Sequence, residues 1–297
     1  MSQNKQFNLK HTFRKLEDLN VIDNFLFQSM LADEQDGETF VRILLSTILG
    51  KKIRKVKIVP QKSILGTDTD KHGIRLDAYI EDISNEVNTN LADVEIIPDI
   101  YDIEPNNIYE KTSLPRRTRY YHGLIDTQLL SSGIHYDKLP NMFIIFILPY
   151  DPFGKNRMVY TISNHCEEDT TIPYDDGAKK IFLYTKGSEG NPSQALRDML
   201  KYIEKSTDDN VTNSDIASIQ ELVNKVKLKK EVGINYMKSW EVEYIARKEG
   251  FNEGHQNMQE KMNQLTLRLA HAGRMDDIVK AAGDKTYQEK LFQEFNL

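Results

Sequence analysis

Hydrophobic and polar positions in the first 60 residues predict two helices followed by a strand. Residues 21–31 form an apolar cluster of helical length. In residues 38–49 the apolar side chains recur at i, i+3, i+4 and i+8, and Gly50 stands where a C-terminal cap belongs. Residues 53–59 alternate in part between apolar side chains and lysines. We expect this strand to stop at Pro60, because proline cannot donate to a sheet ladder.

Two further strands are predicted at residues 73–80 and 91–97. Each alternates strictly, so that one face is apolar and the other carries polar side chains. The polar face of the first strand holds Asp77, and the corresponding face of the second holds Asp93, Glu95 and Ile97. Residues 81–90 are polar and read as a connecting loop. Residues 98–112 are acidic, contain two prolines and show no clear period, which predicts an irregular insertion.

The middle of the chain predicts alternating helices and strands. A helical stripe follows Ser113 and Pro115, and residues 142–148 are a continuous apolar run typical of a strand buried on both faces. Residues 157–162 and 180–184 predict short strands. Asn191 before Pro192 predicts a helix start, and a second helix is expected from about Ser214.

From residue 229 onward the pattern is helical and strongly charged. Six side chains recur with 4-3-4-3-4 spacing, as in a coiled-coil seam: Phe251, His255, Met258, Met262, Leu265 and Leu269. Either the seam packs on its own domain or it joins copies of the chain into a homo-oligomer. Two short helices are predicted near residues 274–282 and 286–295. We therefore expect an arm at residues 1–20, a core at 21–228 and a charged helical extension at 229–297.

Composition is that of a globular protein, with 297 residues, 39% hydrophobic and 28% charged. No apolar run reaches the roughly 18–20 residues needed to span a bilayer, so no membrane association is expected. One cysteine, Cys166, excludes an intramolecular disulfide and favours the reducing cytoplasm. The net charge of −6 argues against a constitutive, tight nucleic-acid binder. It leaves room for an enzyme that meets DNA through a local basic patch.

The acidic residues of the two alternating strands are the candidate chemistry. A hairpin register centred near residue 86 places Asp77 opposite Glu95 and Arg75 opposite Ile97. Directly opposed carboxylates repel each other, so such a pair needs a cation, a shared proton or a nearby arginine. Mg²⁺, which one or two carboxylates hold together with substrate phosphate, fits this requirement. The alternative is an ordinary solvated sheet face on which Arg75 neutralises the acids.

The chain resembles the nuclease-family transposases of the PD-(D/E)XK superfamily, which are related to the recombination-promoting nucleases. The resemblance covers about residues 20 to 250 and rests on the order and spacing of several strings. They are residues 23–27 (DNFLF), 73–77 (GIRLD), 92–95 (ADVE), 115–121 (PRRTRYY), 143–147 (FIIFI), 151–155 (DPFGK), 176–183 (DGAKKIFL) and 246–255 (ARKEGFNEGH).

The resemblance implies a restriction-endonuclease-like α/β fold, with a mixed central sheet flanked by helices. It implies a metal-dependent DNA endonuclease of transposase or recombination type, which hydrolyses phosphodiester bonds with Mg²⁺, or alternatively Mn²⁺. By position, Asp77 matches the first metal-binding aspartate and Glu95 the second acid, and Asp93 is an auxiliary acid. The family normally has glutamine or lysine two residues after the glutamate, where this chain has Ile97.

Ile97 leaves two functions open, because isoleucine donates no hydrogen bond to water. Lys111 or Arg75 would replace the missing group in an active enzyme. The alternative is a catalytically degenerate relative that acts as a DNA- or protein-binding module. Three arginines after the site form a local basic cluster that is expected to contact DNA phosphates: Arg116, Arg117 and Arg119. The alternative is that Tyr121 lies in the core and the arginines form surface ion pairs.

Overall fold

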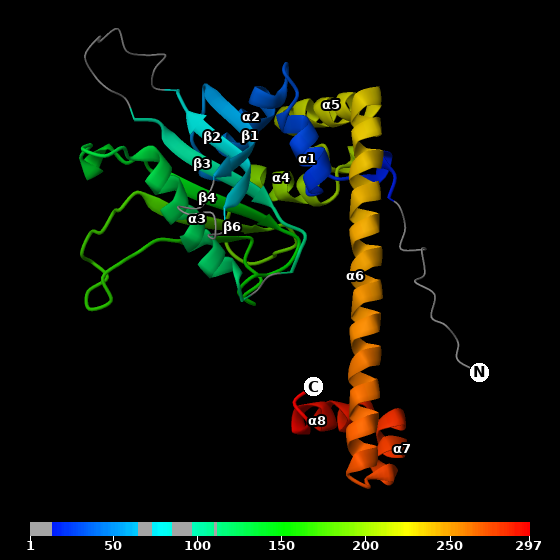
Figure 1. The fold of residues 1–297 in the computed structure, drawn as a ribbon. Coiled ribbons are helices and arrows are strands. Elements are labelled where there is room, and N and C mark those ends of the chain that lie inside the picture. Colours follow the sequence, from blue (N-terminus) through cyan, green and yellow to red (C-terminus); the bar gives the residue numbers. More distant parts are fainter. Residues whose placement is uncertain (1–13, 65–72, 85–96, 110–111) are drawn as a thin grey trace. The chain divides into compact units, whose positions relative to one another are not determined.

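The computed structural model describes residues 14–64, 73–84, 97–109 and 112–297 (Figure 1). The chain divides into two compact units between Gly233 and Ile234, close to the predicted start of the helical extension. The first unit, which begins at Arg14, holds all the described strands. The division falls inside the long helix α6, Lys230–His271.

The first unit is built on a six-stranded mixed sheet, as the α/β prediction requires. Its strands are β1 (Val56–Ile64), β2 (Ile74–Asp82), β3 (Asp99–Pro105), β4 (Met142–Leu148), β5 (Val159–Ile162) and β6 (Ala178–Tyr184). Their order across the sheet is β1-β2-β3-β4-β6-β5. β1, β2 and β3 run antiparallel, β3, β4 and β6 run parallel, and β5 is an antiparallel edge.

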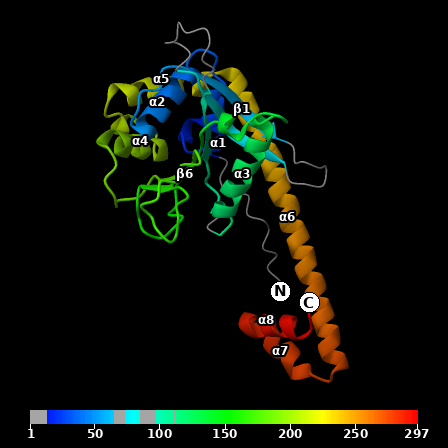
Figure 2. The same ribbon diagram turned by 90° about the vertical axis from the view of Figure 1, so that its left-hand side faces the viewer.

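Helices cover both faces of this sheet. Figures 1 and 2 show α3 (Leu114–Leu129) on one face and four helices on the other. These four are α1 (Asn24–Leu31), α2 (Gly37–Leu49), α4 (Gln194–Glu204) and α5 (Ser214–Leu228). Short 3₁₀ helices stand at Leu16–Asp18 (η1), Tyr136–Lys138 (η3) and Asp208–Asn210 (η4). The α3 face buries Leu114, Leu124 and Ile125 of the helix against Ile144 and Phe146 of the sheet.

The central strand β3 is the main departure from the sequence prediction. It lies within residues 98–112, which were expected to be irregular, and it joins the antiparallel and parallel halves of the sheet. Acidic side chains and a proline hide its apolar pattern, although every residue from Ile100 to Pro105 is buried. Residues 91–96 of the strand predicted at 91–97 lie outside the described residues. Ile97 is half-buried and precedes β3.

Two smaller predictions about ends of elements were also wrong. β1 does not stop at Pro60 but continues to Ile64, which an edge strand tolerates because one side of it needs no ladder bond. The first turn of α4 is capped by Ser193, whose hydroxyl accepts from the Leu196 N–H, and not by Asn191. By contrast, β4 has the predicted bounds, and Gly50 caps α2 with a φ of 64°.

The described part of the second unit consists of α6 from Ile234, α7 (Met275–Gly283) and α8 (Lys285–Glu294). Leu265 and Leu269 of the predicted seam are buried with Ala281 and Leu291, so this end of the seam packs within its own unit. Phe251 and Met258 are 42% and 51% exposed. Self-association through that part stays a prediction. None of the described helices is both long enough and apolar enough to cross a membrane.

A buried aspartate ties the first two helices to α5. The Asp33 side chain is 1% exposed and lies 3.3 Å from Lys225 Nζ and 2.8 Å from Lys229 Nζ. Its Oδ1 also accepts from the N–H groups of Gln35 and Asp36, at the turn into α2. Burial acts to raise the pKa of Asp33, but the hydrogen bonds from Lys229, the backbone and Lys225 outweigh it and hold the pKa far below its usual range.

Replacement of Asp33 by Asn is expected to lower the free energy of unfolding by about 2–3 kcal/mol, since both lysines lose their buried partner. Urea unfolding at pH 7 measures the change. Asp36→Asn is the matched control, because Asp36 also pairs with Lys225 but is 47% exposed. It should cost less than about 1 kcal/mol. Equal losses in the two variants would contradict the assigned role of Asp33.

The fold carries an acid-sensitive histidine. Burial, with a contribution from Lys180, lowers the pKa of His122 from 6.5 to about 4. The unfolded chain therefore binds one more proton than the folded chain between these values. This contribution to stability is complete above pH 6.5 and is lost as the pH falls to 4, to a total of up to about 3 kcal/mol. The free energy of unfolding of the wild type and of His122→Gln is measured across pH 4–7.5. Plotted against pH, the wild-type curve should fall relative to the His122→Gln curve as the pH drops. Parallel curves would refute the prediction.

Candidate active site

The register between β2 and β3 brings two acidic residues together. Tyr79 pairs with Asp102 at the last position of this antiparallel ladder, and a continuation of the same register would set Asp77 opposite Glu104. The Asp77 N–H donates to Glu104 Oε1 at 3.0 Å, which confirms that the two residues are neighbours. The predicted register, which gave Glu95 this place, was therefore wrong by nine positions. Glu95 and Asp93 themselves lie outside the described residues.

An arginine from α3 holds the second acid. Glu104 is 2% exposed, and its Oε2 accepts from Arg117 Nη2 at 2.7 Å. Arg117 Nε donates to Tyr121 Oη at 2.9 Å, and the guanidinium lies 5.1 Å and 5.3 Å from the ring centroids of Tyr121 and Phe146. A charge-assisted bond of this length, with the cation packed on two rings, fixes the carboxylate. Arg117 thus contacts an acid, although sequence reasoning assigned it to DNA.

Asp77 is positioned from the other side by α1. Asn24 Nδ2 donates to Asp77 Oδ2 at 2.8 Å, and Gln28 Nε2 donates to the Asp77 carbonyl at 2.9 Å. The Asp77 side chain is half-buried, so it remains open to solvent and ligands. Burial raises the pKa of Asp77, against the opposing effects of Asn24, Arg117 and Arg75. A cation bound beside Asp77 would favour its ionised form.

Asp102 precedes Glu104 by two residues in β3, so both side chains lie on the same face of the strand. It is fully buried, and neither carboxyl oxygen has a hydrogen-bond partner within the described ranges. Burial raises the pKa of Asp102 far above its usual range, and the charges of Glu104 and Asp77 raise it further, while Arg117 acts in the opposite direction. This environment favours the protonated acid over a third carboxylate.

Asn106 supplies a donor at the carboxyl end of β3. It is 7% exposed, and its N–H donates to the Ile147 carbonyl at 3.0 Å, which extends the β3–β4 ladder. Its Oδ1 accepts from the Ile108 N–H at 2.8 Å. Its Nδ2 has no partner among the residues that the structure describes. Buried donors are almost always satisfied, so this amide is placed to meet a bound water or ligand.

These groups gather where the parallel strands β3 and β4 end, which is where open α/β sheets bind ligands. The facing position on β1 is Gln61, whose φ of 51° is uncommon for a residue other than glycine and typical of functional sites. Over the described ranges, no three His, Cys, Asp or Glu side chains form a metal-ligand group. Mg²⁺ sites in proteins use as few as one or two carboxylates, together with waters and a substrate phosphate.

Only some of the residues predicted for the site lie together in the structure. Asp77 is at its centre, and Arg117 is beside it. Arg116 and Arg119 are exposed on α3 and free to face a ligand in solvent. Lys111, one of the two groups considered as a replacement for Ile97, lies outside the described residues. The other, Arg75, is exposed on the same face of β2 as Asp77.

Sequence reasoning missed Asp102, Glu104 and Asn106. The available signal was the string from Asp102 to Asn106, in which every second residue is polar, next to the apolar Ile100. Counted from Glu104, the position two residues later is Asn106, and it carries the amide that Ile97 lacks. The competing string at 92–95 has the same alternation, so only the strand pairing distinguishes the two.

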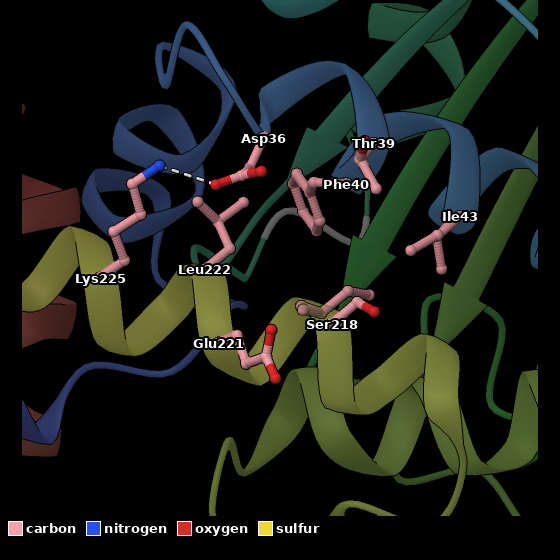
Figure 3. Close-up of a pocket in the computed structure, with 9 residues that line it drawn as sticks. Asp36, Thr39, Phe40, Ile43, Ser218, Glu221, Leu222 and Lys225 are labelled. Atoms are coloured by element: carbon pink, nitrogen blue, oxygen red, sulfur yellow. Dashed lines mark hydrogen bonds and ion pairs between the residues drawn. The ribbon is translucent and has the colours of Figure 1, made fainter.

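Two cavities and a second polar cluster lie elsewhere in the first unit. One cavity of about 290 Å³ lies between α2 and α5, where Lys225 and Asp36 pair beside Phe40 and Leu222 (Figure 3). Another, of about 400 Å³, lies beside the start of α4. No residue of the acidic site lines either cavity.

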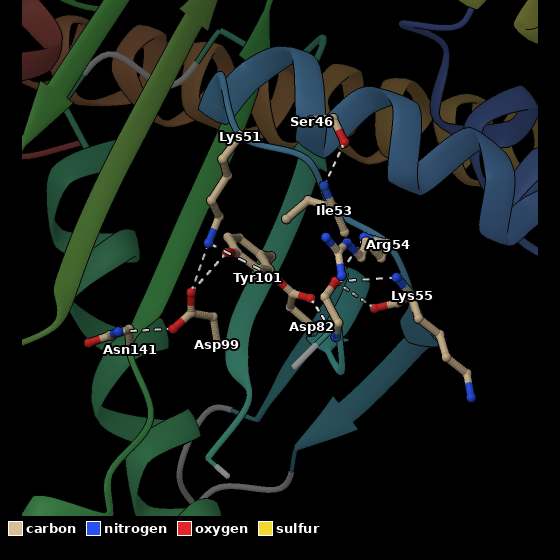
Figure 4. Close-up of polar contacts among 10 residues, drawn as sticks. Ser46, Lys51, Ile53, Arg54, Lys55, Asp82, Asp99, Tyr101 and Asn141 are labelled. Atoms are coloured by element: carbon tan, nitrogen blue, oxygen red, sulfur yellow. Dashed lines mark hydrogen bonds and ion pairs between the residues drawn. The ribbon is translucent and has the colours of Figure 1, made fainter. Parts of the chain in front are cut away.

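The polar cluster closes the amino end of β3. Asp99 accepts from Lys51 at 3.0 Å, Asn141 at 2.9 Å and the Tyr101 hydroxyl at 3.2 Å (Figure 4). All carboxylate oxygens of Asp99 are therefore hydrogen-bonded, and the cluster serves to hold β3 against its neighbours. Functional chemistry is better placed at the other end of the strand.

The chain matches no protein-family model, no curated protein and no solved structure. The resemblance to the PD-(D/E)XK transposases therefore rests on the sequence strings alone, and the function that it implies is a proposal.

Replacement of Asp102 by Asn is expected to stabilise the chain by about 1–2 kcal/mol at pH 8, because the isostere removes an acid that is costly to ionise. A raised folded pKa means that the folded state retains a proton which the unfolded state releases above pH 3.8. Stability of the wild type relative to Asp102→Asn should therefore fall as the pH rises from 4 to 8. Chemical denaturation over this range measures it. A gap that does not widen would contradict the prediction.

Proposed function

We propose that the chain is a metal-dependent DNA endonuclease whose site is formed by Asp77, Glu104 and Asn106. The observation that carries the proposal is the contact of Asp77 with Glu104 near the carboxyl end of β3, the end at which the Asn106 amide has no partner in the described part of the chain. Two carboxylates beside a free donor suit a cation, a water and a phosphate oxygen together.

Mg²⁺, or Mn²⁺ in its place, would supply a bound water of lowered pKa and stabilise charge on the phosphate. Asp77 and Glu104 would hold the ion. Asn24 and Gln28 keep Asp77 in place, and Arg117 keeps Glu104 in place before a metal arrives. Each acid is thus set by a neighbour that is not itself a metal ligand, as is usual in metal sites.

Asn106 takes the part that the family gives to glutamine or lysine. Its Nδ2 can donate to the attacking water or to a phosphate oxygen and so orient either one. An amide has no proton-accepting nitrogen, so Asn106 positions water and is not a general base. The absence of a donor at Ile97 therefore no longer argues against catalysis.

Phosphate contacts are assigned to Arg116 and Arg119. Both are exposed in the first turns of α3, one residue before and two residues after Arg117, which is bound to Glu104. Their guanidinium groups can neutralise backbone phosphates without a requirement for sequence. This local patch reconciles DNA binding with the net charge of −6.

Purified protein is expected to nick plasmid DNA with Mg²⁺ or Mn²⁺ and to lose activity with a chelator. Asp77→Asn and Glu104→Gln should each lower the cleavage rate by about a hundredfold or more, because each removes a metal ligand. Isothermal titration with Mn²⁺ should show the same loss of metal affinity in the absence of DNA.

Glu95→Gln is the control, since Glu95 held the corresponding place in the register that the structure overturns. It should retain activity within about threefold. Cleavage lost in Glu95→Gln and kept in Glu104→Gln would move the site to the other acid. A wild-type chain that binds DNA but never cleaves it would support the binding-module alternative and refute the proposal.

A further inference from the structure

We propose that Ile108 and Tyr109 form a platform for an unpaired nucleobase, which makes DNA with unpaired nucleotides the preferred substrate class. The inference rests on the proposed function for its substrate, but the platform is a separate surface. It consists of the two side chains that directly follow the Asn106–Asn107 pair, with Tyr150 as a brace.

The platform is apolar and open to solvent. Ile108 is 69% exposed and Tyr109 is 65% exposed. Single exposed apolar side chains are common, but two adjacent ones in a short segment beside a polar site are candidates for contact with a ligand. Tyrosine is well suited to such a place, because its ring loses little conformational entropy on contact.

The segment is held in position by the site itself. The Ile108 N–H donates to Asn106 Oδ1 at 2.8 Å, which closes a tight turn at the end of β3. Asn107 Nδ2 reaches Asp23 Oδ1, just ahead of α1, at 3.5 Å. Tyr109 is three residues from Asn106, so it lies within about 10 Å of the site along the chain.

Tyr109 is also supported from one side. Its ring meets Tyr150 with centroids 5.0 Å apart and an interplanar angle of 63°, an edge-to-face arrangement. Tyr150 follows β4 and packs against the core of the α3 face. The Tyr109 ring is therefore braced while most of its surface remains available for stacking.

An unpaired base is the occupant that this chemistry favours. Bases within a duplex have their faces buried in the stack, whereas an unpaired base presents a flat aromatic face. Stacking on a tyrosine is tolerant of sequence and worth about 1–3 kcal/mol per base, or roughly five- to a hundredfold in affinity. The phosphates on either side of that base would fall to Arg116 and Arg119, so one strand would pass from platform to acids.

The test uses full-length chains in the Asp77→Asn background, so that bound DNA stays intact. Binding is measured by fluorescence anisotropy on a fully paired duplex and on the same duplex with a three-nucleotide gap that contains 2-aminopurine. The Asp77→Asn parent should bind the gapped duplex more tightly than the fully paired duplex, and it should quench the fluorescence of 2-aminopurine. Tyr109→Ala should weaken gapped binding by roughly five- to a hundredfold and abolish the quenching. Tyr109→Phe, which keeps the ring, should retain both.

Tyr136→Ala is the matched control, because Tyr136 is 78% exposed and precedes β4, at the opposite end of the strands. It should behave as the parent does. Equal behaviour of Tyr109→Ala and Tyr136→Ala, or equal affinity of the parent for both duplexes, would overturn the inference. A gapped RNA that binds as tightly as the DNA would overturn the assignment to DNA.

The two proposals fail separately. If the wild type cleaves plasmid DNA but Tyr109→Ala binds the gapped duplex normally, the platform proposal is refuted and the nuclease proposal stands. If the wild type cleaves no DNA but Tyr109→Ala loses affinity for the gapped duplex, the nuclease proposal is refuted. That result would support the platform as a binding surface.

Discussion

Asp77 and Glu104 are neighbouring acids where the β2–β3 ladder ends, and the central part of this sheet depends on how their negative charge is relieved. Glu104 is almost fully buried, so it cannot rely on water. A backbone N–H from the opposite strand satisfies one of its oxygens, and Arg117 satisfies the other. Asp77 is relieved differently, by the Asn24 amide and by its partial exposure. The helices α1 and α3 thus contribute to the same acid pair from two directions.

This arrangement gives the pair an internal counterion, the guanidinium of Arg117. The guanidinium of Arg117 is held by the rings of Tyr121 and Phe146, which limits how far it can follow Glu104. Burial raises the pKa of Asp102 and so favours its uncharged form beneath the pair. The net negative charge around the pair is therefore small.

Most of the fold was readable from hydrophobic periodicity, because buried strands and amphipathic helices follow their own repeats. β4 and α2 were predicted within a residue or so of their bounds for this reason. β3 was not, because a strand whose buried face carries Asp102 and Glu104 has the composition of a loop. Glu104 is held inside the sheet by Arg117, a partner on another element that no local pattern reveals. Asp77 was found from alternation, while its true partner required the register.

The Asn106 side chain links the shape of a turn to the placement of a hydrogen-bond donor. The Oδ1 of its carboxamide shapes the turn that presents Ile108, and its Nδ2 is a buried donor with no partner among the described residues. A substitution that suits one task therefore disturbs the other. Lysine at this position would bring a stronger electrostatic partner for the phosphate, yet it would release the turn. Residue 106 and residues 108–109 should consequently change together among related sequences, as one mutational unit.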